Sequence, residues 1–222
     1  MSKKILLLLA LFTSTLAYSQ KKDFAAWYTL AGRYEITKKI KLDISEELRT
    51  ISNASISDQF FTDLGISYKF NKYVSLGGYY RFIKKREKDD NFHTRNRFYG
   101  ELQLSFPFKQ FELEYRFRFQ RQVNEYFEDI EDDKPILYNR HKIELSYNIP
   151  NFKLTPSFSY ERFYRLKYVN SYFADNVRYG IGLNYKFNKK HLVSVSYLIN
   201  KDLYPKEKYL YILSLGYKFT FK

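Results

Sequence analysis

Apolar and polar residues alternate along nearly the whole sequence, and this alternation constrains the fold more than any other feature. The clearest run is 111–120, FELEYRFRFQ, with aromatic or leucine residues at the odd positions and charged or polar residues at the even ones. Successive side chains of a strand point to opposite faces, so such a run has one apolar and one polar face. A soluble sandwich can alternate too, but it seldom needs this many aromatic residues on one face. We therefore expect an all-β chain.

Eleven segments show this pattern, and each is long enough to cross a bilayer as a tilted strand, which takes about 9–11 residues. They are residues 24–36, 40–50, 59–70, 73–84, 93–106, 111–123, 138–149, 152–165, 175–187, 191–200 and 208–221. Short turns alternate with longer, charged loops near 50–58, 84–93, 124–137, 166–174 and 201–207. Membrane barrels have short periplasmic turns and long extracellular loops. The predicted fold is a transmembrane, antiparallel, up-and-down β-barrel of about 10–12 strands.

The strand count raises a question about the first segment. Bacterial single-chain barrels normally have an even number of strands, and segment 24–36 would begin on the extracellular side. Two interpretations stay open: the segment lies partly inside or beside a ten-stranded barrel, or a missed strand brings the count to twelve. Glu46, on an outward face, and Pro156, inside a strand, each predict a nearby bulge.

The first 19 residues have the order of a secretory signal peptide. Lys3 and Lys4 precede an apolar run at 5–12, and small and polar residues follow. We expect cleavage after Ser19, with cleavage after Ala17 as the alternative, and a single mature domain at 20–222. The apolar run is too short to span a bilayer as a helix. Because the chain has no cysteine, neither a lipoprotein signal nor a disulfide is expected.

The last strand ends in a pattern that resembles the recognition signal of outer-membrane barrels. Ser214, Gly216, Phe219 and Phe221 supply its polar, glycine and aromatic positions and form the predicted C-terminal assembly signal. One departure is Lys222, which follows the final aromatic residue. Similar aromatic-Lys-aromatic ends recur in the repeated segments 63–72 and 179–190. All three strand ends are predicted to descend to one aromatic girdle at the periplasmic side.

Composition agrees with a barrel and narrows its partners. Aromatic residues make up 20% of the chain and charged residues 28%, while the mean hydropathy is −0.53. A barrel wall needs both kinds, because alternate residues face lipid and water. The formal charge is +14, or +12 once Lys3 and Lys4 leave with the signal. An exported chain rarely meets nucleic acid, so the expected partners are outer-membrane lipid, lipopolysaccharide and, during insertion, the barrel-assembly machinery. The oligomeric state stays open.

The polar face is predicted to line a charged lumen. The lumen residues singled out by parity are Arg95, Arg97, Glu101, Glu112, Glu114, Arg116, Arg118, Lys142, Glu144 and Glu161. Further residues of inward parity are Lys41, Asp43, Glu47, Arg49, Asp63, Arg81, Arg140, Arg178 and Lys186. On the hairpin 93–123, the side chains expected to face lipid are Phe98, Leu102, Leu113, Tyr115 and Phe117. On the inward face of the same hairpin, Arg and Glu side chains of opposite charge can pair across the two strands and form a ladder. Either this ladder sets selectivity in a channel, or it fills the barrel and leaves no pore.

Little in the sequence could support catalysis or hold a cofactor. His93 lies near Asp89 and Asp90, and a second outer loop has an acidic run at 125–133. These could mimic a protease rim or bind calcium through carboxylate oxygens, but solvated loop charge explains both better. The chain has no glycine-rich phosphate loop, Cys/His cluster or nucleotide fingerprint. We therefore expect no metal, no cofactor and no enzymatic activity.

The mature chain is similar to an uncharacterised family of Gram-negative outer-membrane β-barrels known only as a domain of unknown function. The resemblance rests on the opening Phe24-Ala-Ala-Trp27, the segment Glu46-Glu-Leu-Arg49 and the aromatic strand ends. It implies a porin-like fold in the outer membrane and no particular activity. From the residues, our leading hypothesis is a narrow channel for small hydrophilic or anionic solutes. A pore-free structural or loop-binding barrel is the alternative, and a barrel enzyme comes third.

Overall fold

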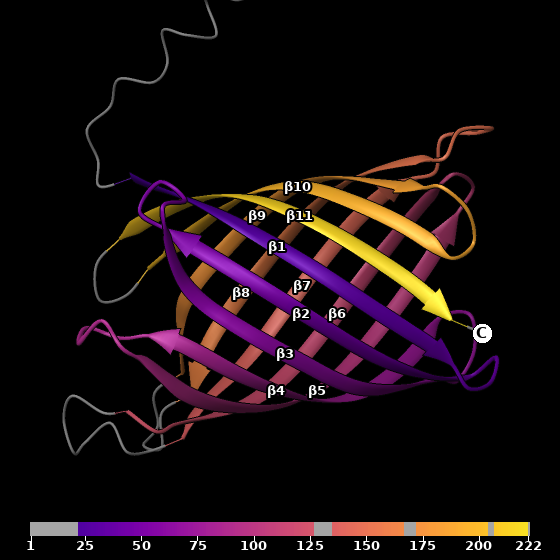
Figure 1. Ribbon diagram of the computed structural model, residues 1–222. Helices are drawn as coiled ribbons and strands as arrows, with labels where there is room; N and C mark the ends of the chain where they lie inside the picture. The colour runs from indigo at the N-terminus through magenta and orange to yellow at the C-terminus, as the bar shows by residue number, and fades with distance from the viewer. Residues whose placement is uncertain (1–21, 127–134, 167–171, 204–206, 222) are drawn as a thin grey trace, which may run out of the picture.

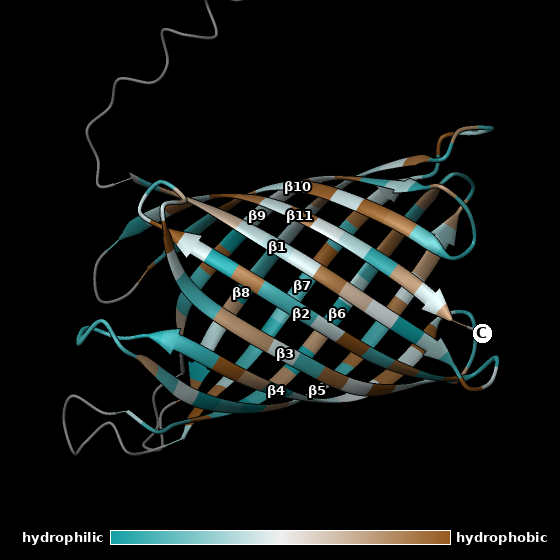
Figure 2. Ribbon diagram, in the orientation of Figure 1, coloured by the Kyte–Doolittle hydropathy of each residue, from teal (hydrophilic) through white to brown (hydrophobic). Residues whose placement is uncertain are grey.

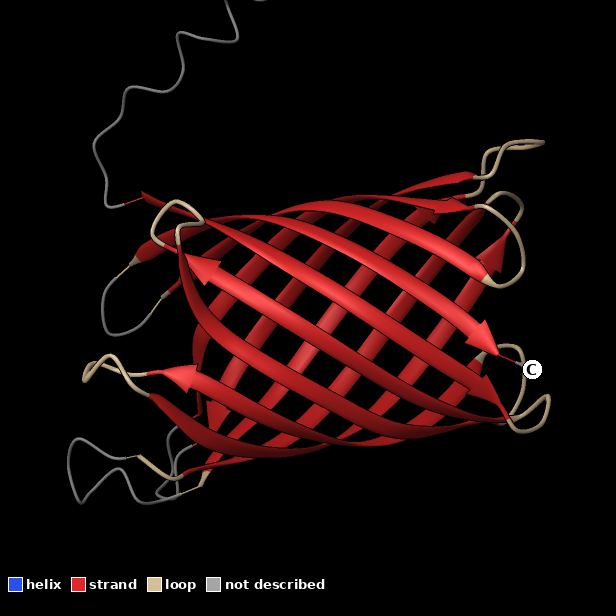
Figure 3. Ribbon diagram, viewed as in Figure 1, coloured by secondary structure: helices blue, strands red, loops and turns tan. Residues whose placement is uncertain are grey.

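The computed structural model describes residues 22–126, 135–166, 172–203 and 207–221. They form one closed barrel of eleven strands (Figures 1 and 3). The strands are β1 (Lys22–Glu35), β2 (Ile40–Ile51), β3 (Ile56–Lys69), β4 (Val74–Arg86), β5 (Phe92–Phe108), β6 (Phe111–Asn124), β7 (Ile136–Tyr147), β8 (Leu154–Leu166), β9 (Tyr172–Lys186), β10 (His191–Asp202) and β11 (Lys208–Phe221). Within the described ranges, no helix is long and apolar enough to cross a membrane.

The barrel closes through a parallel pair. Each strand pairs antiparallel with the next along the chain, and β1 pairs in parallel with β11, from Lys22↔Tyr209 to Tyr34↔Phe221. An up-and-down barrel with an odd number of strands needs one such pair, because its first and last strands run the same way (Figure 1). The predicted barrel is confirmed, and its strand number lies within the expected range. The two interpretations of segment 24–36 were both wrong, since it forms a wall strand and the described residues contain no twelfth strand.

The connections at the two ends of the barrel differ in length. The end where β11 finishes has the connections 36–39, 70–73, 109–110, 148–153 and 187–190, and we call it the short-turn end. At the opposite end, the long-loop end, β1 begins (Figure 1). The β2–β3 connection there, expected at 50–58, spans only 52–55 because both strands extend further than predicted.

The start of β1 is fastened to this β2–β3 connection. The Asp23 carboxylate accepts hydrogen bonds from the backbone N–H groups of Ser52 and Asn53, each at 2.9 Å, and the N–H of Ala54 donates to the Phe24 carbonyl at 3.0 Å. Ser52, Asn53 and Ala54 have φ angles of 55°, 56° and 63°. Side-chain-bearing residues rarely adopt this left-handed conformation. The contacts hold the first strand at the long-loop end.

The outer face of the barrel is apolar along the middle of the strands and aromatic toward the short-turn end. Figure 2 shows apolar and polar residues alternating along each strand. Exposed aliphatic side chains on the outer face are Leu30, Ile44, Leu64, Ile66, Leu76, Ile143, Ile181 and Leu183. Exposed aromatic side chains near the short turns are Tyr34, Tyr68, Phe70, Tyr73, Phe106, Phe108, Phe111, Phe152, Phe187 and Phe221. This is the surface that an outer-membrane type of barrel presents to lipid.

The repeated strand ends have a common geometry. Each places two aromatic rings edge to face, an arrangement that aromatic quadrupoles favour. Ring centroids lie 4.9, 4.8 and 4.5 Å apart, with interplanar angles of 80°, 82° and 80°, in the pairs Tyr68–Phe70, Tyr185–Phe187 and Phe219–Phe221. The three pairs lie at the short-turn end. The sequence repeat therefore marks β3, β9 and β11, three of the six strands that run in this direction and end there.

Glu46 stays on the outward face of β2. The hydroxyl of Thr62 on β3 donates to its two carboxylate oxygens, at 2.8 and 2.9 Å. A bulge does occur in this strand pair, between Arg49 and Thr50, but it does not turn Glu46 inward. A hydrogen bond to a neighbouring strand thus partly compensates for the outward carboxylate.

The bulge predicted at Pro156 was wrong. Pro156 lies in β8 opposite Leu183 of β9 without a break in register. On the other side, the pairing of β8 with β7 stops at Ser157, so no ladder hydrogen bond is required from the proline nitrogen. The irregularity of β8 lies instead between Phe163 and Tyr164.

The outward direction of Ile181 yields a test of the wall. Ile181 is 60% exposed on the outer face, whereas Phe187 lies at the short-turn rim. If the barrel is embedded in lipid, Ile181→Arg should lower the free energy of unfolding by about 2–4 kcal/mol and Phe187→Arg by roughly 0–1 kcal/mol. Urea titration of the refolded barrel in lipid vesicles measures both. Equal losses at the two positions would contradict an apolar belt centred on Ile181.

Candidate functional site in the barrel lumen

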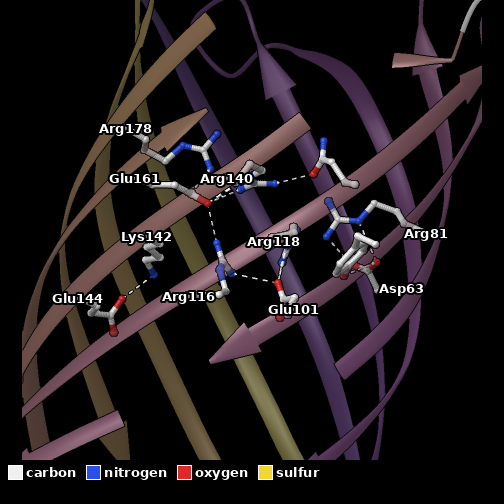
Figure 4. A network of polar contacts seen from close by, with 12 residues as sticks. Asp63, Arg81, Glu101, Arg116, Arg118, Arg140, Lys142, Glu144, Glu161 and Arg178 are labelled. Atoms are coloured by element: carbon white, nitrogen blue, oxygen red, sulfur yellow. Dashed lines mark hydrogen bonds and ion pairs between the residues drawn. The ribbon is translucent and has the colours of Figure 1, made fainter. Parts of the chain in front are cut away.

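Charged side chains from eight strands, β2 to β9, meet inside the barrel. The inner face includes all ten predicted lumen residues, Arg95, Arg97, Glu101, Glu112, Glu114, Arg116, Arg118, Lys142, Glu144 and Glu161. They do not form one ladder along the hairpin 93–123. A network that crosses several strands joins some of them, and the others pair elsewhere (Figure 4).

Glu161 on β8 is the centre of this network. Its Oε1 accepts hydrogen bonds from Nη2 of Arg116, at 2.6 Å, and from Nη2 of Arg140, at 2.8 Å. Nη1 of Arg178 lies 3.7 Å from its other carboxylate oxygen (Figure 4). Glu161 is only 4% exposed, and a buried carboxylate requires such partners.

Two further carboxylates extend the network toward β3. Glu101 pairs with Arg118 and, at 3.5 Å, with Nη1 of Arg116, which links it to the Glu161 group. Asp63 accepts both a hydrogen bond from Nε of Arg81, at 2.9 Å, and a second bond from the same guanidinium. The Tyr99 hydroxyl lies 3.0 Å from Asp63 as a third donor. Each of these carboxylates is thus held by more than one donor.

The remaining predicted lumen residues do not pair with the opposite charges that the predicted hairpin ladder would give them. Arg95 binds Glu87 near the long-loop end, and Arg97 donates to the amide oxygen of Gln122 at 3.0 Å. Glu114 accepts a hydrogen bond from Gln103 at 3.0 Å, and Lys142 pairs with Glu144 on its own strand at 2.6 Å. Glu112 lines a cavity nearer the short turns. Of the hairpin carboxylates, Glu101 is the one that forms ion pairs within the hairpin.

Aromatic rings support four of the arginines from behind. The guanidinium carbons lie 3.7, 3.9, 4.1 and 4.2 Å from ring centroids in the pairs Arg49–Trp27, Arg81–Phe61, Arg118–Tyr99 and Arg140–Phe163. Such cation–π contacts fix the plane of a guanidinium without using its N–H donors. The rings therefore hold the four guanidinium groups in place, while their N–H edges bind carboxylates.

The arginines surround a cavity of about 230 Å³, which we call the arginine chamber. Eight basic side chains and one acidic side chain line it: Arg49, Arg81, Arg97, Arg116, Arg118, Arg140, Lys142 and Arg178, with Glu161. A second cavity, of about 120 Å³, shares Arg116 and Lys142 with the chamber and adds carboxylates. It adjoins a third, of about 250 Å³, whose lining reaches the short turns at Lys39 and Lys72. The three cavities lead from the short-turn end to the chamber.

Other parts of the lumen are filled by side chains. Tyr79 and Tyr99 stack with ring centroids 4.9 Å apart and an interplanar angle of 9°. The Tyr79 ring lies so close to Gly65 that a Cβ atom there would be 2.0 Å from it, so only glycine fits at this position. On the opposite wall, Ala25, Trp27 and Ile212 form a buried apolar cluster. These groups narrow the lumen around the chamber.

The aromatic partners of the arginines were not predicted from the sequence. Trp27 attracted notice only as part of an opening motif, and Phe61 and Phe163 were not singled out. A signal was present, because Phe61 has the parity of Asp63 and Phe163 that of Glu161. An aromatic residue of inward parity, two positions from a lumen charge, could therefore have been included in the predicted site.

The predicted C-terminal signal lies in β11 between β10 and β1. Ser214 is opposite Ser196 on one side and Trp27 on the other. Gly216 faces Ser194, whose hydroxyl would be 2.4 Å from an added Cβ. Phe219 and Phe221 belong to the aromatic rim described above. How this segment acts during assembly stays a prediction.

The three histidines do not form a catalytic group with each other. Nε2 of His93 lies 2.7 Å from the Asp89 carboxylate in the β4–β5 loop, and this hydrogen bond lowers the pKa of Asp89. His141 and His191 instead contact tyrosine hydroxyls on the outer face, at 2.7 and 2.6 Å.

The described ranges contain no group of three or more residues that could hold a metal ion. Of the acidic run Glu125, Glu128, Asp129, Glu131, Asp132 and Asp133, all but Glu125 lie outside the described residues. The calcium hypothesis for this loop therefore stays untested, as does the predicted signal peptide at 1–19, which also lies outside them.

The closed wall, its apolar belt and its charged interior define a β-barrel of the outer-membrane type. The chain belongs to the family described as protein of unknown function (DUF2490), which it matches over residues 24–210. No curated protein matches the sequence. A solved structure described as a bacterial polysaccharide outer membrane secretin resembles the fold, with a TM-score of 0.51 and 9% sequence identity, over 78% of this chain and 72% of that one. At this identity, the likeness concerns the fold alone.

The central role of Glu161 can be tested by neutralising it. Glu161→Gln would leave Arg116, Arg140 and Arg178 with a weaker shared acceptor, and breaking such a buried pair costs about 3–5 kcal/mol in the free energy of unfolding. Glu144→Gln is the matched control on β7, because its pair with Lys142 is more exposed and should contribute under about 1 kcal/mol. Urea titration in vesicles compares the two. Equal effects would show that Glu161 is no more important than a peripheral pair.

Proposed function

We propose that this protein is a narrow outer-membrane channel that admits small anionic solutes. The observation that carries the proposal is the composition of the arginine chamber, in which eight basic side chains and one carboxylate surround a single cavity. Rings of one charge sign set ion selectivity in pores. An excess of guanidinium groups lowers the energy of an anion inside the barrel and raises that of a cation.

The adjoining cavities support passage rather than surface binding alone. They reach from the short turns to the chamber and share lining residues at each junction, Arg116 and Lys142 at one and Glu101, Gln103 and Glu114 at the other. Their small size favours ions and small solutes over bulky ones. The proposal includes no catalytic step.

A pore-free structural or loop-binding barrel is the second candidate. It is supported by the ion pairs that cross the lumen and by the stacked Tyr79 and Tyr99. The apolar cluster of Ala25, Trp27 and Ile212 further reduces the open section toward β1 and β11. In that case, the charges would stabilise the wall, and ligands would meet the loops at the long-loop end.

Both candidates place the chain in the outer membrane, with lipid and lipopolysaccharide around the belt. Insertion by the barrel-assembly machinery is proposed to use the terminal residues Ser214, Gly216, Phe219 and Phe221. A solvent-exposed long-loop end would follow from the usual orientation of such barrels.

Cysteine labelling tests location and orientation together. The chain has no native cysteine, so Ser55→Cys at the long-loop end and Lys189→Cys at the short-turn end can each be read alone. A membrane-impermeant maleimide should label Ser55→Cys on intact cells and Lys189→Cys only after the outer membrane is permeabilised. Recovery of the protein as a soluble species, or the reverse labelling pattern, would contradict the proposed placement.

Electrical recording tests the channel. Purified protein in a planar bilayer should give discrete conductance steps, and its zero-current potential in a potassium chloride gradient should indicate anion preference. Arg97→Glu should shift this potential toward cation preference, because it reverses one charge of the chamber. Arg121→Glu is the matched control, since Arg121 lies on the outward face opposite Phe98. A folded barrel without conductance, or one that both variants affect equally, would contradict the channel.

A further inference from the structure

The arginine chamber has more positive charge than its protein partners neutralise. Seven of its eight basic residues pair with five carboxylates of the described chain, and the eighth, Arg97, pairs with none of them; the carboxylates are Glu47, Asp63, Glu101, Glu144 and Glu161. Three positive charges are therefore left without a carboxylate. Buried charge of one sign is costly unless a counter-charge joins it, so the chamber as built favours an anion.

Two arginines have donors that no carboxylate uses. Arg97 donates to the neutral amide of Gln122 and forms no ion pair among the described residues. The Nε atom of Arg116 is buried and has no hydrogen-bond partner in the described part of the chain. Both side chains line the chamber. A buried donor without an acceptor is unfavourable, and an anion in the cavity could relieve it.

The donors are also held rigidly. Aromatic rings fix Arg49, Arg81, Arg118 and Arg140 from one side, and carboxylates hold the edges of Arg81, Arg118 and Arg140. These guanidinium forks bind carboxylates, so they add fixed positive charge around the cavity, and the donors left for an anion are those of Arg97 and Arg116. An oxyanion suits such donors, because its several oxygens can each accept a charge-assisted hydrogen bond from a different guanidinium. A spherical halide ion has no separate acceptor atoms.

We propose that the arginine chamber is a binding site for a phosphate or sulfate group, a tetrahedral oxyanion with up to two negative charges. This inference deepens the proposed function by naming the anion class, and it holds for a filled barrel as well. The volume of about 230 Å³ compares with about 30 Å³ per water molecule in the liquid. The chamber thus accommodates one such group with a few waters or a small organic substituent, and it excludes a polymer.

Calorimetric titration of the folded protein in detergent tests the site. Inorganic phosphate, sulfate and glycerol phosphate are each titrated against a sodium chloride background of equal ionic strength, so that unspecific screening is constant. We expect saturable binding of one equivalent for at least one of them. Glycerol phosphate binding would indicate a phosphorylated solute, and binding of the inorganic ions alone would indicate the free oxyanion. Failure of all three to bind would overturn the proposal.

Arg97→Gln is the informative variant, because Arg97 has no carboxylate partner that its loss would leave unpaired. Removing one charged donor should weaken the affinity at least about tenfold. Arg121→Gln removes the same charge from the outer face and should bind as the unmodified protein does. Equal weakening in both variants would overturn the site, and heat-modifiable gel migration verifies that each variant is folded.

The outcomes separate this inference from the channel. Oxyanion binding without conductance would retain the site and refute the channel, leaving a binding barrel. Conductance without oxyanion binding would retain the channel and refute the site. If both hold, phosphate or sulfate should also reduce the chloride current, since the bound oxyanion occupies the path.

Discussion

A strand wall that faces lipid has no water with which to satisfy its backbone, so its two edges must pair with each other. This constraint determines the architecture of the barrel more than any side-chain contact. The chain supplies eleven strands, and its first and last strands therefore meet in the same direction. Their parallel pairing, fastened at one end by Asp23 and the β2–β3 connection, completes the ladder of hydrogen bonds around the wall.

Closure in turn creates the chemistry of the interior. Inward side chains from all sides face a narrow space, and charges that lie far apart in the sequence come within hydrogen-bond distance. Glu161 on β8 binds Arg116 on β6 as well as Arg140 on β7, and Trp27 on β1 lies between Arg49 of β2 and Arg178 of β9. The same ion pairs that stabilise the wall leave an excess of guanidinium groups around one cavity. The arginines that stabilise the wall are therefore also the residues of the candidate functional site.

Local pattern was enough to predict the strands and the direction of their side chains. The alternation in 111–120 places Leu113 outward and Arg116 and Arg118 inward, as the structure has them. The rule of even strand number argued against the observed count, because closure by a parallel pair leaves no mark in a local pattern. Closure depends on whether the first and last strands meet, and the periodicity of a single segment gives no information about such a contact.

The candidate site was harder to predict for the same reason. Neighbouring strands of a hairpin can be aligned from sequence, so a ladder along 93–123 was the natural expectation. The chamber instead joins strands that are neighbours of neighbours or lie across the lumen, such as β2 and β9. Parity shows that Arg49 and Arg178 face inward, but it does not show that one tryptophan contacts both.

The parallel seam between β1 and β11 also has a consequence for the order of folding. All other strand pairs join consecutive segments, so a turn or a single loop brings their edges together at a small cost in chain entropy. The seam joins Lys22 to Tyr209, and such non-local contacts form slowly because nearly the whole chain must be ordered first. We therefore expect closure to be the last step of folding. Until it occurs, the strand with the terminal aromatic residues has an open edge, while the basic residues of the interior are still accessible to water.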